Sequence, residues 1–276
     1  MLFRSLQEIN LKKEDVREKR YAGIFHIVSA ADGAEKAYTQ NMKNNPARYE
    51  TLEEARAVDK RLLAAVTGHD HLKIIPNYEI DKNGKRKVLS FKQKKKRFFQ
   101  ELFLALGIPA HLEIERKFLV ALNVDFLLLP KEQAVTNIQQ TYLKKIIPNV
   151  QRRVRMRTHD GNAMYIFTEK IPQRPGVRIE REEIIGLREY LTLLQERDPR
   201  RSIILKDRYS FVWAQQYFQL DNFHSPMPLT LLEIELPHEK THIELPPFLK
   251  IIRDVTEDPR YSNSSIAKGI CPGYKK

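Results

Sequence analysis

The chain has 276 residues, and its 48 basic and 35 acidic side chains leave a formal net charge of +13 at pH 7. This length allows one large or two small domains, and a composition of 42% hydrophobic and 30% charged residues excludes wholesale disorder. The longest apolar runs, such as Phe118 to Leu122, are far too short to span a membrane. The single cysteine, Cys271, excludes a disulfide framework and fits a reducing cytosol. The positive charge predicts an anionic partner: nucleic acid, anionic lipid or polyphosphate.

Residues 1 to 107 have the pattern of an α/β domain. Ile24 to Val28 is a short continuous apolar run, typical of a strand buried on both faces of a parallel sheet. Thr51 to Glu54 has the sequence of a capping box that opens a helix, and a second apolar strand is predicted from Leu72 to Pro76. A basic helix from Phe91 to Leu106 ends the region.

From residue 108 to residue 276 the hydrophobic pattern changes to the period of two that is typical of β-strands. Two short helices, 187–195 and 246–255, interrupt the strands. Eight antiparallel strands predict a closed or nearly closed barrel, so the whole chain is expected to be an α+β protein. The predicted strands are 111–121, 135–145, 151–159, 164–171, 177–185, 201–213, 216–223 and 229–236.

Several predicted strands carry charged residues on one face. On a single strand such a face is usually an outer, solvated one. Here the charges are sorted by chemistry over six strands, which favours an inner surface that binds a polyanion through cations and a divalent metal through carboxylates. The sets are Glu113, Glu115 and Lys117; Arg153, Arg155 and Arg157; Thr168 and Lys170; Arg178, Glu180 and Glu182; Lys206 and Arg208; and Glu233 and Glu235.

The segment Glu113-Ile114-Glu115-Arg116-Lys117 resembles the Glu-x-Glu-x-Lys signature of the CYTH, or triphosphate tunnel metalloenzyme, superfamily. Further charged landmarks follow in that superfamily's order, from the arginines after residue 152 to the Glu233-Ile234-Glu235 pair. The resemblance implies an eight-stranded antiparallel tunnel that binds a triphosphate together with Mg²⁺ or Mn²⁺.

The resemblance and the charge pattern together predict the residues of the site. The catalytic residues are Glu113, Glu115 and Lys117. The phosphate ligands are Arg153, Arg155, Arg157, Lys170, Arg178, Lys206 and Arg208. The metal ligands are Glu113, Glu115, Glu233 and Glu235, with Glu180 and Glu182 in reserve.

Residues 1 to 107 resemble the C-terminal half of a P-loop kinase-like ATPase domain. No Gly-x-x-x-x-Gly-Lys-Ser/Thr motif, which would cradle phosphates, occurs in the sequence. We therefore expect either a truncated form of a longer protein, the favoured alternative, or a half-domain kept as a structural partner of the tunnel. The order of the two regions resembles the family of TRPL translocation defect proteins, which implies GTP binding, phosphoinositide binding and membrane-protein trafficking.

Two function classes follow. The first is metal-dependent binding, with or without hydrolysis, of a triphosphate or nucleotide in a cytoplasmic trafficking regulator. The alternative is an inorganic tripolyphosphatase or nucleoside triphosphatase, and the sequence leaves turnover open. The basic segment from Lys82 to Arg97 is either a solvated face or a contact with phosphoinositide-containing membranes through Lys94, Lys95 and Lys96. Nucleic acid is disfavoured as a partner, because the basic segment shows no interleaved stacking aromatics.

Overall fold

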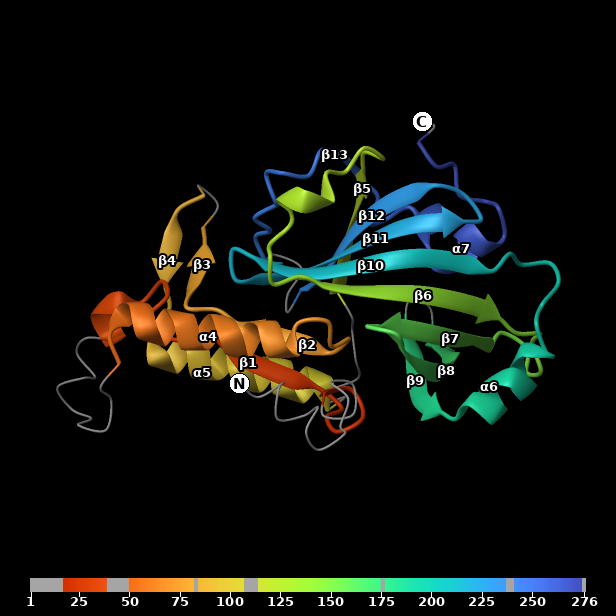
Figure 1. The fold of residues 1–276 in the computed structure, drawn as a ribbon, viewed down its shortest axis with the longest axis horizontal. Helices are drawn as coiled ribbons and strands as arrows, with labels where there is room; N and C mark the ends of the chain where they lie inside the picture. The colour runs from red at the N-terminus through yellow and green to blue at the C-terminus, as the bar shows by residue number, and fades with distance from the viewer. Residues whose placement is uncertain are drawn as a thin grey trace.

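The computed structural model describes residues 17–38, 50–81, 84–106, 114–174, 177–236 and 241–274, without the side chains of residues 172–179. It is an α+β structure in which a large curved antiparallel sheet lies beside a smaller layer built from the N-terminal region (Figure 1). No helix in the described ranges is both long and apolar enough to cross a membrane.

The N-terminal layer is built around two parallel strands. Its elements are β1 (Ile24–Ile27), α4 (Leu52–Val66), β2 (Leu72–Ile75), β3 (Tyr78–Ile80), β4 (Arg86–Val88) and α5 (Phe91–Ala105). The predicted capping box is confirmed: the Thr51 side chain accepts a hydrogen bond from the Glu54 amide, and the Glu54 side chain accepts one from the Thr51 amide. Burial of β1 on both faces is not found: Ile27 is 51% exposed, whereas its neighbour His26 is buried. Among the described residues, β2 is the one strand paired with β1.

The large sheet has the strand order β13-β5-β12-β11-β10-β6-β7-β8-β9, and all of its pairs are antiparallel. Eight of the nine strands were predicted, three of them with identical bounds. The strands are β5 (Ile114–Val120), β6 (Ala134–Tyr142), β7 (Gln151–His159), β8 (Asn162–Arg174), β9 (Val177–Ile185), β10 (Ile204–Trp213), β11 (Gln216–Ser225), β12 (Leu229–Leu236) and β13 (Ile251–Asp254).

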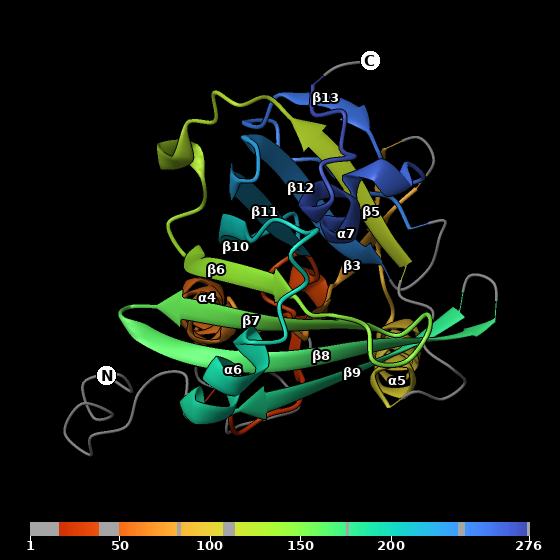
Figure 2. The same cartoon turned by 90° about the vertical axis from the view of Figure 1, so that its right-hand side faces the viewer.

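The ninth strand corrects the sequence-based prediction of a helix over 246–255. β13 pairs along the edge of β5 that β12 leaves free, and its two consecutive isoleucines suit an extended edge strand. Within the described residues no pairing joins β9 to β5 or β13, so the sheet curls without closing into the expected eight-stranded barrel (Figure 2). The other predicted helix is confirmed as α6 (Leu187–Leu194).

The two faces of the large sheet differ in chemistry. We call the face that carries the charged sets the inner face. The outer face is apolar: Phe118, Phe211, Leu232 and Ile234 pack there against the chain around η1 (Phe126–Leu128). At one end the inner face also becomes apolar, because residues of the same parity as the charged ones pack against α7 (Asn263–Ala267) within the curve of the sheet (Figure 2). These residues are Leu119, Tyr142, Ile204, Phe223 and Leu231.

Candidate functional site

The first charged cluster of the inner face lies on β5, β12 and β10. The strand register places Lys117 opposite Glu233 and Glu115 opposite Glu235. The Nζ atom of Lys117 lies 2.8 Å from Glu233 and 3.6 Å from Glu115, and Arg208 approaches Glu233 to 3.1 Å. The buried carboxylate of Glu233 is thus held by two cations, whereas Glu115 shares one of them.

Because of this unequal sharing, the pKa values of Glu115 and Glu233 shift in opposite directions. Burial, followed by the charge of Glu233, raises the pKa of Glu115 to about 7. Burial acts in the same direction on Glu233, but Lys117 and Arg208 outweigh it and hold the pKa of Glu233 well below its ordinary value. Glu115 is therefore the carboxylate that a further cation would stabilise most.

The second cluster lies on β10 and β11. Asp221, which is fully buried, forms ion pairs with both Lys206 and Arg208, the latter at 2.6 Å. Burial lowers the pKa of Lys206 to about 8, although Asp221 acts in the opposite direction. Asp221 is not among the predicted ligands, and it holds two predicted phosphate ligands in place.

The third cluster follows β7, β8 and β9. Arg153 lies 2.7 Å and Lys170 2.6 Å from Glu180, which therefore serves two cations. Arg155 pairs with Glu182, which also accepts a hydrogen bond of 3.0 Å from Thr168. Arg153, Arg155 and Lys170 are thus each held by a carboxylate from β9, which is adjacent to β8 and the next strand but one from β7.

Arg157 differs from its neighbours, because its partner comes from the N-terminal layer. It forms an ion pair with Asp70, and Lys73 pairs in the same way with Glu235. Sequence reasoning missed Asp70 and Lys73. Asp70 lies in the loop before β2 and Lys73 lies near the start of β2, and neither belongs to a periodic charge pattern that would mark it as a site residue. Asp70 also lies 87 positions from its partner Arg157 in the sequence.

The remaining predicted residues are placed as follows. Glu113 and the side chain of Arg178 lie outside the described part of the structure. Lys94 is partly buried, donates to the carbonyl oxygen of Val28 at 2.6 Å and to Asn77, and its binding to lipid stays a prediction. Burial lowers the pKa of Lys94 to about 8. Lys95 and Lys96 are exposed, and their binding to lipid stays a prediction.

The carboxylates of the inner face fit a divalent cation in donor chemistry, since Mg²⁺ and Mn²⁺ prefer oxygen ligands. Glu115, Glu233 and Glu235 would hold it. In the arrangement described, however, the ammonium of Lys117 lies between Glu115 and Glu233. Searched over the described ranges, the structure brings no three His, Cys, Asp or Glu side chains together as metal ligands.

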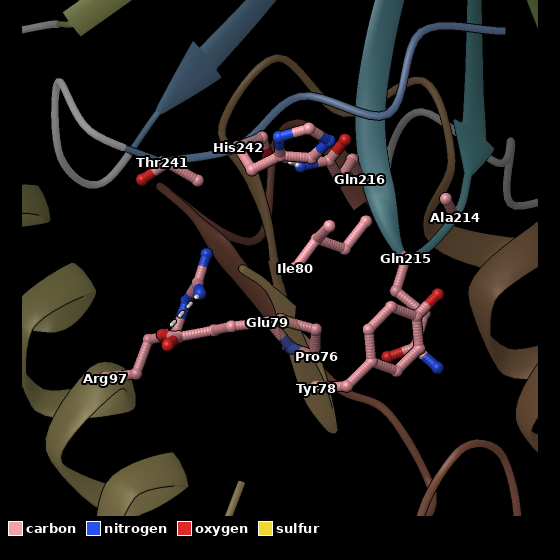
Figure 3. Close-up of a pocket in the computed structure, with 10 residues that line it drawn as sticks. All are labelled: Pro76, Tyr78, Glu79, Ile80, Arg97, Ala214, Gln215, Gln216, Thr241 and His242. Carbon is pink, nitrogen blue, oxygen red and sulfur yellow. Dashed lines mark hydrogen bonds and ion pairs between the residues drawn. The ribbon is translucent and has the colours of Figure 1, made fainter. Parts of the chain in front are cut away.

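Two cavities lie where the N-terminal layer meets the large sheet. The larger, of about 230 Å³, is bounded by Tyr78 and the Glu79–Arg97 ion pair on one side and by Gln215 and His242 on the other (Figure 3). The smaller, of about 60 Å³, reaches the inner face, and its lining includes Asp70, Glu115, Glu233 and Glu235. A residue of the N-terminal layer thus shares a cavity with three predicted metal ligands.

No family model matches the chain. An inorganic triphosphatase of Nitrosomonas europaea is 32% identical to it over 161 residues, which are 57% of this chain and 98% of that protein. The chain belongs to the family of this inorganic triphosphatase. The family covers little more than half of the chain, so it says nothing of the rest.

Solved structures also resemble part of the chain. A crystal structure of an inorganic triphosphatase matches with 30% identity and a TM-score of 0.40, over 57% of this chain and 95% of that one. A protein from Pyrococcus horikoshii matches with 17% identity and a TM-score of 0.35, over 49% of this chain and 80% of that one. Scores of this size do not establish a common overall arrangement.

Proposed function

We propose that this chain binds a linear triphosphate on the inner face of the large sheet and hydrolyses it with the help of a divalent metal. The observation that carries the proposal is a chain of ion pairs, Lys117–Glu233–Arg208–Asp221, in which cations and carboxylates alternate and both carboxylates are buried. The four residues lie on four adjacent strands. The family of the inorganic triphosphatase supports the same reaction.

The cations would hold the phosphates. Arginine donates two parallel hydrogen bonds to a phosphate, and lysine adds a compact charge. Each of these cations is now paired with a carboxylate, so a bound triphosphate would take the place of those carboxylates as the anion. The proposed phosphate ligands are Arg153, Arg155, Lys170, Lys206 and Arg208, with Arg157 and Arg178 as further candidates.

The carboxylates that the phosphates displace would then be free for the metal. Glu115 and Glu233, with Glu235 beside them on β12, would hold Mg²⁺ or Mn²⁺, and Glu113 is a further candidate. When bound, the metal would offset charge on the transferred phosphoryl group and help to position water. Glu180 and Glu182 serve the arginines of β7 in the described arrangement and are the weaker metal candidates.

The findings favour this triphosphatase over the trafficking regulator that the order of the two regions implied. The named relative is an inorganic triphosphatase, and nothing in the described residues supports GTP or phosphoinositide binding. We further propose that the region up to residue 107, which has no phosphate-cradling motif, hydrolyses no nucleotide and is a structural partner of the region from residue 108.

The test is phosphate release from tripolyphosphate, ATP and GTP by the full chain, with Mg²⁺ or Mn²⁺, beside equilibrium binding of the same compounds. We expect release from tripolyphosphate, and its loss in Glu115→Gln. Glu257→Gln, which changes an exposed carboxylate elsewhere, is the matched control. Binding without phosphate release would mean that the inner face is a binding module. If the chain neither binds nor hydrolyses these compounds, the proposal is refuted.

A further inference from the structure

A short segment of the N-terminal layer, Gly68 to Lys73, lies across one end of the inner face; we call it the closing segment. It touches the ends of four strands, all of which the register places at the same end of the sheet. Its contacts are those of Gly68 with Ala134 on β6, Gly68 and His69 with Tyr217 on β11, Asp70 with Arg157 on β7, and Lys73 with Glu235 on β12.

The geometry at Gly68 shows how closely the closing segment approaches. Gly68 has φ +99°, and a Cβ atom at this position would lie 2.8 Å from the Cβ of Ala134. Its amide donates to the hydroxyl of Tyr217 at 3.2 Å, and that hydroxyl donates to the carbonyl of His69 at 3.2 Å. The segment is therefore packed against the strand ends through its backbone, and its position does not depend on charge alone.

The opposite end of the inner face is filled by the apolar layer that packs against α7. Lys206 lies at the boundary of that layer, with its Nζ 4.8 Å from the ring centre of Phe223. The charged part of the inner face is thus bounded along the strands on both sides, by apolar side chains at one end and by the closing segment at the other.

Asp70 places a negative charge at this second boundary. Arg153, Arg155 and Arg157 follow one another on the same face of β7, about 7 Å apart per step. The first two pair with carboxylates of β9, whereas the last in the row pairs with Asp70. Burial acts against the charge of Asp70, but Arg157, Arg155 and Arg208 together hold its pKa far below the ordinary value. Asp70 therefore remains an anion among the cations.

We propose that Asp70 limits the length of the phosphate chain that the inner face accepts. This inference rests on the proposed function. A triphosphate that engages Arg153 and Arg155 leaves Arg157 to Asp70. A longer chain extended along the same row would bring its next phosphate against the Asp70 carboxylate, and two anions in a partly buried site repel one another.

The experiment measures the affinities of the full chain for tripolyphosphate and for long-chain polyphosphate by calorimetry, with and without Mg²⁺. In Asp70→Asn we expect the affinity for long-chain polyphosphate, relative to tripolyphosphate, to rise by about tenfold. Asp70→Glu keeps the charge and should keep the wild-type ratio. Asp160→Asn is the matched control, because its carboxylate is 79% exposed in the turn after β7. Circular dichroism shows whether each variant is folded.

An unchanged ratio in a folded Asp70→Asn variant, with tripolyphosphate still bound, would overturn the role of Asp70 and leave the proposed function intact. The same holds if Asp70→Glu and Asp70→Asn raise the ratio equally, because the charge would then be irrelevant. If Asp70→Asn does not fold, Asp70→Ser serves for the same comparison. Failure of the wild-type chain to bind either compound would overturn the proposed function and this inference together.

Discussion

Lys117 and Glu233 face each other across the β5–β12 pair, and their charged atoms lie 2.8 Å apart beneath the surface. Burial lowers the pKa of an ammonium, but the carboxylates of Glu233 and Glu115 outweigh it and raise the pKa of Lys117 above its ordinary value. Lys117 is thus a permanent cation at the place where a metal would meet the carboxylates. Under the proposed function, binding of a divalent metal would rearrange this pair, and the ammonium would turn to the phosphate.

The first prediction concerns Glu115 and pH. The pKa of this carboxyl is raised from 4.5 to about 7, first by burial and then by Glu233. Between these values the folded state binds more protons than the unfolded state, so the free energy of unfolding should fall as the pH rises from about 4.5 to about 7. Glu115→Gln should remove this loss and be more stable at pH 8 by about 1 kcal/mol, a discounted figure because the side chain is 43% exposed.

Urea unfolding at pH 5 and pH 8 checks this prediction. The two proteins should differ more at pH 8 than at pH 5, and Glu257→Gln should follow the wild type at both. If Glu115→Gln is less stable than the wild type at pH 8, the carboxylate is not under repulsion in the folded chain.

The second prediction concerns Arg155 as a phosphate ligand. Arg155→Ala should weaken tripolyphosphate binding about tenfold or more even without metal, because a charge-assisted hydrogen bond contributes about 1.5 to 3 kcal/mol. Calorimetry in the presence of a chelator measures it. Arg181→Ala is the control: this exposed arginine lies on β9 with the opposite parity to Glu182. Equal affinity of the two variants would place Arg155 outside the binding surface.

The third prediction concerns Asp221, the buried partner of Lys206 and Arg208. Asp221→Asn leaves two buried cations without their shared carboxylate, which should lower the free energy of unfolding by about 3 to 5 kcal/mol. Asp207→Asn, on the same sheet but with a partly exposed side chain, should cost less than about 1 kcal/mol. Denaturant unfolding compares the two, and similar losses would contradict the role given to Asp221.

The fourth prediction concerns Lys206, whose pKa burial lowers to about 8. The ammonium is lost as the pH rises through that value, so the affinity for tripolyphosphate should fall between pH 7 and pH 9. Lys206→Gln should bind more weakly at pH 7 and lose this part of the pH dependence. A pH profile identical in the variant and the wild type would show that another group is responsible.

The strands of the large sheet could be predicted from the sequence, because alternation of side chains is a local property of an extended backbone. The same alternation placed Arg153 and Arg155, or Lys206 and Arg208, on one face before any pairing was known. β13 was not predicted, because its four residues show no alternation of apolar and polar side chains. It is a strand because it pairs with β5.

Which charges meet was decided by the tertiary structure alone. The sequence determined that carboxylates and cations line the same faces of the strands, but register and curvature choose Glu233 for Lys117 and Glu180 for Lys170. Asp70 and Lys73 reach the inner face only because the N-terminal layer packs across the strand ends. Contacts between residues far apart in the chain depend on how whole elements pack, and no pattern within either segment encodes them.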